Sequence, residues 1–187
     1  MTQQVAAAHA SIEVRVDEIT QLFNTLDPVP FHERDLDQDA EEFIVGWARE
    51  LPRNRPLRLV IHLPKREAES ERAAKLRDAL ARYFSYRAEM VGRELSEMFR
   101  IGRLSLAIGL SVLAICTLAR ALLHQSVVER ELGGFVGEGL LILGWVANWR
   151  PIEIFLYSWW PLARTRNLYR RLAAAEVALE ADPQPTR

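Results

Sequence analysis

Several features that mark common classes of soluble protein are scarce in this chain of 187 residues. A single cysteine excludes a disulfide framework and a zinc site built on cysteines. The 24 basic side chains are balanced by 25 acidic ones, and the lack of a positive field argues against binding to nucleic acid. Residues 1–10 lack the basic start and apolar core of a secretory signal, and we predict that they form a flexible N-terminus.

Signatures of catalysis are missing as well. The chain has no glycine-rich phosphate loop and no recognisable pair of nucleophile and base. Asp35, Asp37 and Asp39 have the spacing of the first ligands of a calcium loop, but that loop's glycine and bidentate glutamate are absent. We therefore predict that the protein is not an enzyme and holds no metal or cofactor. A membrane-tethered enzyme that uses His32, Asp35 and His62 is the weakest hypothesis.

Charge is absent from residues 104–119, which read LSLAIGLSVLAICTLA. Extended to residues 101–123, with Arg103 and Arg120 reaching the headgroups, a helix here is about 34 Å long and crosses a hydrocarbon core of roughly 30 Å. The alternative is a buried helix of a soluble protein. A second apolar run follows within the next few turns, which favours two membrane spans.

The second run predicts transmembrane helix 2 over residues 135–157, joined to helix 1 by an external loop over residues 124–134. Pro151 predicts a bend near Arg150, after which the helix continues to about Tyr157. The alternative is that residues 152–160 lie flat on the membrane surface. Amphipathic aromatic rings favour the headgroup layer, and they predict an interfacial belt. Its members are Trp145, Trp149, Tyr157, Trp159 and Trp160.

The flanking charges predict the orientation. Arginines precede the first run and follow the second, whereas the loop between them holds Arg130 as its one firm cation. Both termini are therefore expected in the cytoplasm.

Two features predict how the spans pack. In an antiparallel hairpin, the residue numbers of two facing residues add up to a constant. Arg103 and Glu153 add up to 256, and Arg120 and Glu138 add up to 258. These pairs are predicted intramembrane ion pairs, unless each charge reaches water by itself. Small residues permit close approach of helices in lipid, and the seam they form packs either against the chain's own second span or against a second copy. These residues are Gly102, Ser105, Gly109, Cys116, Gly137 and Gly144.

Residues 11–64 predict a small cytoplasmic α/β domain. Residues 12–16 alternate between apolar and charged, residues 39–51 have helical periodicity with Asp39 and Glu42 at capping-box spacing, and residues 57–63 form a second strand. Two strands make a poor sheet, so we expect a second chain or residues 18–31 to complete it. The acidic side chains before and within the helix are a predicted partner surface. They are Asp35, Asp37, Asp39 and Glu42.

The rest of the chain completes the predicted fold class, α/β plus transmembrane helices. Residues 65–100 predict a juxtamembrane helix that enters the first span without a break, and residues 158–187 an interfacial and cytoplasmic tail with a short amphipathic helix.

Three segments resemble an uncharacterised family of bacterial membrane proteins: residues 34–52 (RDLDQDAEEFIVGWARELP), 57–64 (LRLVIHLP) and 144–172. The resemblance covers residues 12–175 and implies a bacterial inner membrane, with no activity assigned. We expect an integral membrane protein that anchors a small interaction domain, which self-associates or docks a partner. The alternative is an accessory subunit of a transporter or channel, with Asn148, Arg150 and Glu153 facing a larger helical bundle.

Overall fold

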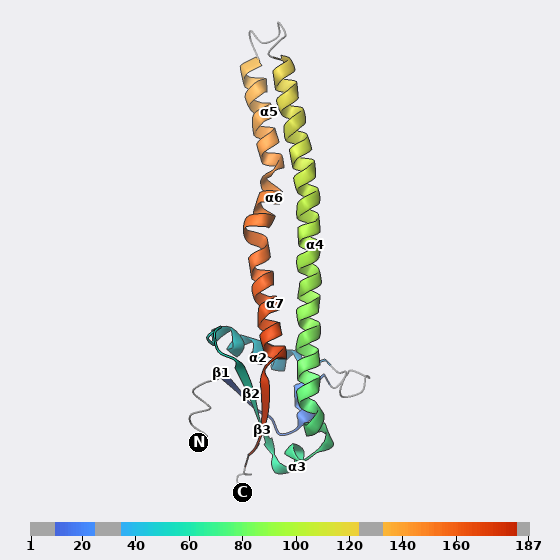
Figure 1. Ribbon diagram of the computed structural model, residues 1–187, viewed down its shortest axis with the longest axis vertical. Helices are drawn as coiled ribbons and strands as arrows, with labels where there is room; N and C mark the ends of the chain where they lie inside the picture. The colour runs from blue at the N-terminus through green and yellow to red at the C-terminus, as the bar shows by residue number, and fades with distance from the viewer. Residues whose placement is uncertain (1–9, 25–34, 124–132, 183–187) are drawn as a thin grey trace. The chain divides into compact units, whose positions relative to one another are not determined.

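The computed structural model describes residues 10–24, 35–123 and 133–182. Over these residues the chain is mostly helical, with one three-stranded parallel sheet. It divides into two compact units, and Figure 1 labels their elements. The first, which we call the sheet unit, contains residues 1–91 and 164–187. The second, which we call the hairpin unit, contains residues 92–163.

The sheet has the order β1-β2-β3, with β1 (Ala10–Arg15) and β3 (Glu176–Asp182) both parallel to the central strand β2 (Leu57–Pro64). Alternation puts Leu57, Leu59, Ile61 and Leu63 on one face of β2, and all four are buried. The strands predicted around residues 12–16 and 57–63 are therefore present.

The prediction of what completes the sheet is wrong. The third strand comes from neither residues 18–31 nor a second chain, but from the C-terminal segment that we expected in a helical tail. Residues Ile19–Leu22 instead form a short 3-10 helix, η1. Pairing of Leu59 with Val177 and of Ile61 with Leu179 puts these apolar side chains on the covered face of the sheet.

Helices cover that one face. They are α2 (Gln38–Glu50), the start of α4 (Glu71–Leu123) and the end of α7 (Trp159–Ala173); a short helix, α3 (Lys65–Ala68), follows β2. The predicted capping box is displaced, because Asp37 rather than Asp39 is the N-cap of α2 and its carboxylate accepts the Asp39 N–H at 3.0 Å. The predicted helix over residues 65–100 is interrupted before Ser70, whose Oγ accepts the Ala73 N–H at 3.2 Å.

The hairpin unit consists of the later part of α4 and a second, segmented helical stretch. That stretch contains α5 (Gly133–Ala147), α6 (Trp149–Glu153), the π-helix η4 (Ile154–Ser158) and the start of α7. It is interrupted at Asn148, three residues before Pro151, which has no N–H to bond back to the preceding turn. The expected bend near Arg150 thus corresponds to a break at Asn148, and the helix continues past Tyr157 instead of ending there.

The position of β3 makes a prediction about stability. Leu179→Ser places a hydroxyl on the covered face and should destabilise the sheet unit by about 2 kcal/mol. Ala178→Ser, on the opposite face, should cost less than about 0.5 kcal/mol. Hydrogen exchange of the β2 amides in the full chain, held in mild detergent, measures both. Equal protection in the two variants would contradict the assignment of Leu179 to the core.

Candidate functional site

The carboxylate of Glu41 on α2 accepts hydrogen bonds from three side chains of the sheet unit. Its Oε2 accepts the Tyr83 hydroxyl at 2.7 Å, and its Oε1 accepts the Tyr169 hydroxyl at 2.8 Å and Nε of Arg87 at 3.0 Å. The Arg87 guanidinium also donates to the Tyr169 hydroxyl at 3.3 Å and lies 5.4 Å from the centroid of that ring. One carboxylate therefore joins α2, α4 and α7.

The electrostatics of this group favour a charged carboxylate. Burial raises the pKa of Glu41, but the hydrogen bonds from Tyr83 and Tyr169 and the charge of Arg87 outweigh it, so the pKa lies below its ordinary value of 4.5. Burial and then the hydrogen bond to Glu41 raise the pKa of both tyrosine hydroxyls. All three donors point at the carboxylate, so the arrangement ties the three helices together.

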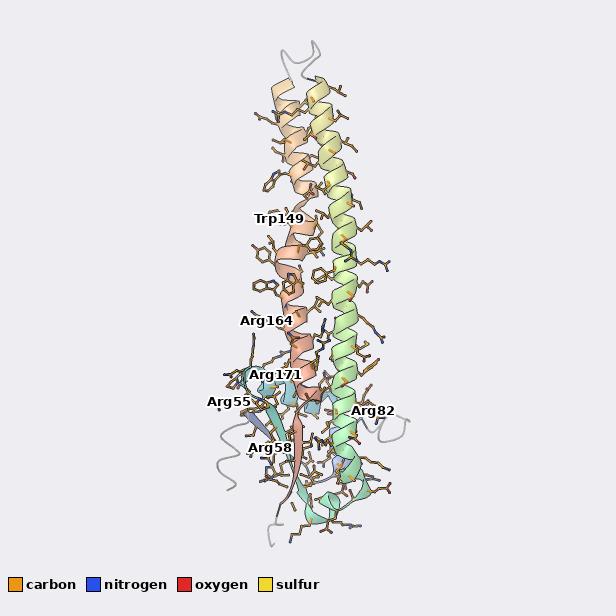
Figure 2. All side chains as sticks on the ribbon, viewed as in Figure 1. Arg55, Arg58, Arg82, Trp149, Arg164 and Arg171 are labelled. Carbon is orange, nitrogen blue, oxygen red and sulfur yellow. The ribbon has the colours of Figure 1, made fainter. Side chains whose placement is uncertain are left out.

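Other polar contacts in the sheet unit also serve the fold. The Arg171 guanidinium on α7 donates to the carbonyl oxygens of Pro52 at 2.9 Å and Arg55 at 3.1 Å, and so holds the turn before β2 (Figure 2). His62 lies on the uncovered face of the sheet, with Nε2 3.6 Å from Glu13 Oε2 and Nδ1 3.9 Å from Glu180 Oε2. Among the residues that the structure describes, no group of three or more potential ligands could hold a metal ion.

The four acidic residues of the predicted partner surface have different roles. Asp37 caps α2, Asp39 and Glu42 are exposed on it, and Glu42 accepts Nε2 of Gln38 at 3.2 Å. The carbonyl oxygen of Asp35 accepts the Asn24 N–H at 2.9 Å. His32, the remaining residue of the enzyme hypothesis, lies outside the described residues.

In the hairpin unit, the two helical stretches approach closely at Gly109. The Asn148 side-chain N–H donates to the carbonyl oxygens of Gly109 at 3.0 Å and Gly144 at 2.8 Å. A Cβ on Gly109 would lie 2.7 Å from Oδ1 of Asn148 and 2.8 Å from the Ala147 carbonyl oxygen. Only a glycine fits there, and the break in the second stretch points Asn148 across the interface.

Other glycines of the predicted seam also face the opposite stretch. A Cβ on Gly102 would lie 2.9 Å from Ile154, and one on Gly144 would lie 2.7 Å from a methyl of Leu113 and 3.7 Å from Cβ of the buried Cys116. In four contacts across the hairpin, the two residue numbers add up to 256 or 257. The contacts are Gly102–Ile154, Gly109–Asn148, Gly144–Leu113 and Gly137–Arg120. Of the two partners considered for the seam, the chain's own second stretch therefore occupies it, with Ser105 half-buried beside it.

The predicted ion pairs are not formed between the described residues. Glu153 pairs instead with Arg150 three residues earlier, at 2.9 Å, and the Arg120 side chain packs over Gly137. Arg103 and Glu138 are both exposed. The register puts the two residues of each predicted pair at nearly the same position along the helix axes. Their side chains nevertheless point in different directions around those axes, so they do not meet.

The predicted aromatic belt divides into two groups. Trp145, Trp149, Tyr157 and Trp160 are exposed, and Figure 2 shows Trp149 on the outside of its helix. Trp159 instead packs on Phe99, with ring centroids 6.3 Å apart, and its Nε1 donates to the Phe155 carbonyl oxygen at 3.0 Å. The register also puts Trp145 level with Val112, the middle of residues 101–123, and so away from either end of that run.

Sequence reasoning missed Glu41 as the centre of a network and Asn148 as an interhelical donor. A signal for Asn148 existed, because an amide side chain beside a proline in an apolar run has to find a partner. No local signal connects Glu41 with Tyr169, since 128 residues separate them.

No protein-family model, curated protein or solved structure matches this chain. The described residues do include two helical stretches that are long and apolar enough to cross a membrane.

The Glu41 network predicts a pH dependence. Because the pKa of Glu41 is lowered in the folded state, the unfolded state binds more protons near pH 4.5, and the stability that the carboxylate provides should be lost as the pH falls below that value. Glu41→Gln should remove this part of the slope and cost about 2 kcal/mol at pH 7. Urea unfolding of the full chain in detergent measures both, with Glu42→Gln as the exposed control. A wild-type slope retained in Glu41→Gln would contradict the prediction.

The Gly109 contact predicts the effect of adding one methyl group. Gly109→Ala should separate the helical stretches and increase hydrogen exchange in residues 133–147. Gly139→Ala is the matched control, because nothing lies within 4 Å of a Cβ at that position. It should leave exchange unchanged or slow it, since alanine is the better helix former by up to about 1 kcal/mol. The same exchange rates in both variants would show that the close approach at Gly109 does not hold the hairpin together.

Proposed function

We propose that the hairpin unit is embedded in a lipid bilayer. The observation that carries this proposal is that most of its large exposed side chains are apolar. On α4 each of these is at least half exposed: Ile101, Leu104, Ile108, Leu110, Ile115, Leu118 and Leu122. The second helical stretch adds others, among them Phe135, Ile142, Leu143, Val146 and Leu156. In water this surface would far exceed the apolar patches that soluble monomers carry.

The length and burial of the stretches support the same conclusion. The exposed apolar side chains on α4 extend over about 32 Å of helix, which matches a hydrocarbon core of roughly 30 Å. In the core helix of a soluble protein, most of such a run would be buried. Here 17% of the most apolar window of α4 and 22% of that of the second stretch are buried.

The sheet unit is then the part that works in water, and we propose that it binds a partner protein. It contains a folded core and a carboxylate that accepts three hydrogen bonds, but no nucleophile–base pair among its described residues. Recognition is therefore a better-supported role than catalysis. The arginines beside both apolar runs favour a cytoplasmic location for this unit. The resemblance of residues 12–175 to bacterial membrane proteins favours the inner membrane.

A specific observation favours a second candidate, an accessory subunit of a transporter or channel. The ion pair between Arg150 and Glu153 lies on the exposed surface of the hairpin unit, within the segment that we propose is embedded. Charged groups in that position are costly against lipid tails, whereas a neighbouring helical bundle could cover and pair them. In that case Glu153→Gln should change transport by the complex.

Membrane embedding is tested by extraction. We expect the full chain to stay in the membrane fraction after an alkaline carbonate wash and to be released by detergent. Ile108→Arg with Ile115→Arg should move much of it to the soluble or aggregated fraction, because each arginine deep in a span costs about 2.5 to 3.5 kcal/mol on insertion. Ser85→Arg, on the exposed face of α4 in the sheet unit, should have no such effect. Wild-type chain that stays in solution without detergent would refute the proposal.

A further inference from the structure

Two aromatic side chains of the sheet unit are left half exposed on α2. Phe43 is 45% exposed and Trp47 is 50% exposed, although Phe23 and Phe84 of the same unit are almost completely buried. The two residues are one helical turn apart, and their ring centroids are 6.1 Å apart. Adjacent aromatic rings that the described part of the chain leaves uncovered are typical of protein-binding surfaces, where such rings contribute most of the affinity.

Gly46 lies between Phe43 and Trp47 in the sequence, and nothing within the described chain requires a glycine there. No atom lies within 4 Å of the position a Cβ would take, and the backbone is not in the left-handed region. A glycine inside a helix nevertheless costs about 0.5 to 1 kcal/mol relative to alanine. In the hairpin unit, Gly102, Gly109 and Gly144 each have a close neighbour on the opposite stretch, whereas Gly134 and Gly139, like Gly46, have none within 4 Å. At Gly46 the missing side chain leaves open space beside Phe43 and Trp47, which another molecule could fill.

The charges around this opening select the partner. Asp39 and Glu50 lie at the two ends of the same helical stripe and Glu42 lies at its side, and all three are exposed. Arg49 is the one exposed cation on α2. Antiparallel pairing of two copies about Gly46 would put Glu42 opposite Glu50, which disfavours self-association through this face. The same carboxylates repel anionic lipid headgroups, so a basic protein segment is the complementary occupant.

We infer that this face of α2 binds a basic amphipathic helix of a partner protein, with one apolar side chain seated over Gly46 beside Phe43. In this common binding mode, the apolar face of an amphipathic helix packs on an apolar surface. Lysine or arginine side chains of the bound helix lie opposite the carboxylates of α2. The inference rests on the proposed role of the sheet unit as a binding unit, and it names the surface and the chemistry of the partner. The α2 face consists of Asp39, Glu42, Phe43, Gly46, Trp47 and Glu50.

The probe is a phage-displayed library of 18-residue helical peptides. Apolar residues are fixed at helical spacing, and the other positions vary among lysine, glutamate, glutamine and alanine. The target is the full chain in phosphatidylcholine nanodiscs, with counter-selection on empty nanodiscs to remove peptides that bind lipid. We expect enriched peptides with a net positive charge. Enrichment of acidic or neutral peptides, or of none that depends on the α2 face, would overturn the inference.

Variants then locate the site, with affinity measured by fluorescence anisotropy of the selected peptide. Trp47→Ser and Gly46→Ala should each weaken binding about tenfold or more. Gly46→Ala is the sharper variant, because alanine favours the helix and the loss cannot come from unfolding; thermal unfolding should confirm equal or higher stability. Gly139→Ala is the matched glycine control and should bind like the wild type. Binding unchanged in Gly46→Ala and Trp47→Ser would overturn the inference.

A lipid-facing role for the same face has its own outcome. If brominated phosphatidylcholine quenched the fluorescence component that Trp47→Phe removes, the α2 face would lie in the headgroup layer, and the inference would be wrong. None of these outcomes affects the alkaline extraction of the hairpin unit. Failure of this inference is therefore distinguishable from failure of the proposed membrane anchoring.

Discussion

The constraint on which the rest depends is that the apolar outer surface of the hairpin unit has to leave water. In a bilayer, lipid tails are as apolar as leucine, so the hydrophobic effect cannot hold α4 against α5. Close contact and hydrogen bonding have to do so. The glycines of the seam provide the contact, and Asn148 provides a donor to the Gly109 carbonyl oxygen at 3.0 Å. The break that interrupts the second stretch thus also supplies a polar bond between the helices.

The sheet imposes a second dependence, on the order of assembly. Its central strand β2 pairs with β1 from near the start of the chain and with β3 from near the end. The Glu41 carboxylate likewise needs Tyr169, and the core needs Leu168 and Leu172. All of these C-terminal partners follow the hairpin unit along the chain. The sheet unit therefore cannot complete its core until the hairpin residues have been synthesised, and under the proposed membrane embedding this couples its folding to insertion.

Local patterns in the sequence predicted the parts of the fold that depend on local patterns. Alternation over residues 12–16, the apolar residues of 57–63 and the long apolar run correspond to β1, β2 and part of α4. The strand β3 was missed because its alanines and Leu179 favour a helix, although Leu179 and Ala181 alternate with the polar Glu180 and Asp182. Adding the numbers of facing residues predicted the hairpin register. It did not predict the ion pairs, because Glu153 pairs with Arg150 on its own helix. The Glu41 network joins residues far apart in the chain, and no local pattern encodes it.

The two faces of α2 now explain each other. Ile44, Val45 and Ala48 fix the helix on the core, and Glu41 binds α4 and α7 from the same side. The opposite face carries Phe43, Trp47 and the unexplained Gly46. A helix held this firmly loses little conformational entropy when a partner binds, so even a small apolar surface can contribute usable affinity. In the proposed recognition, the partly buried Glu41 carboxylate contributes indirectly, by keeping the exposed aromatic pair in one place.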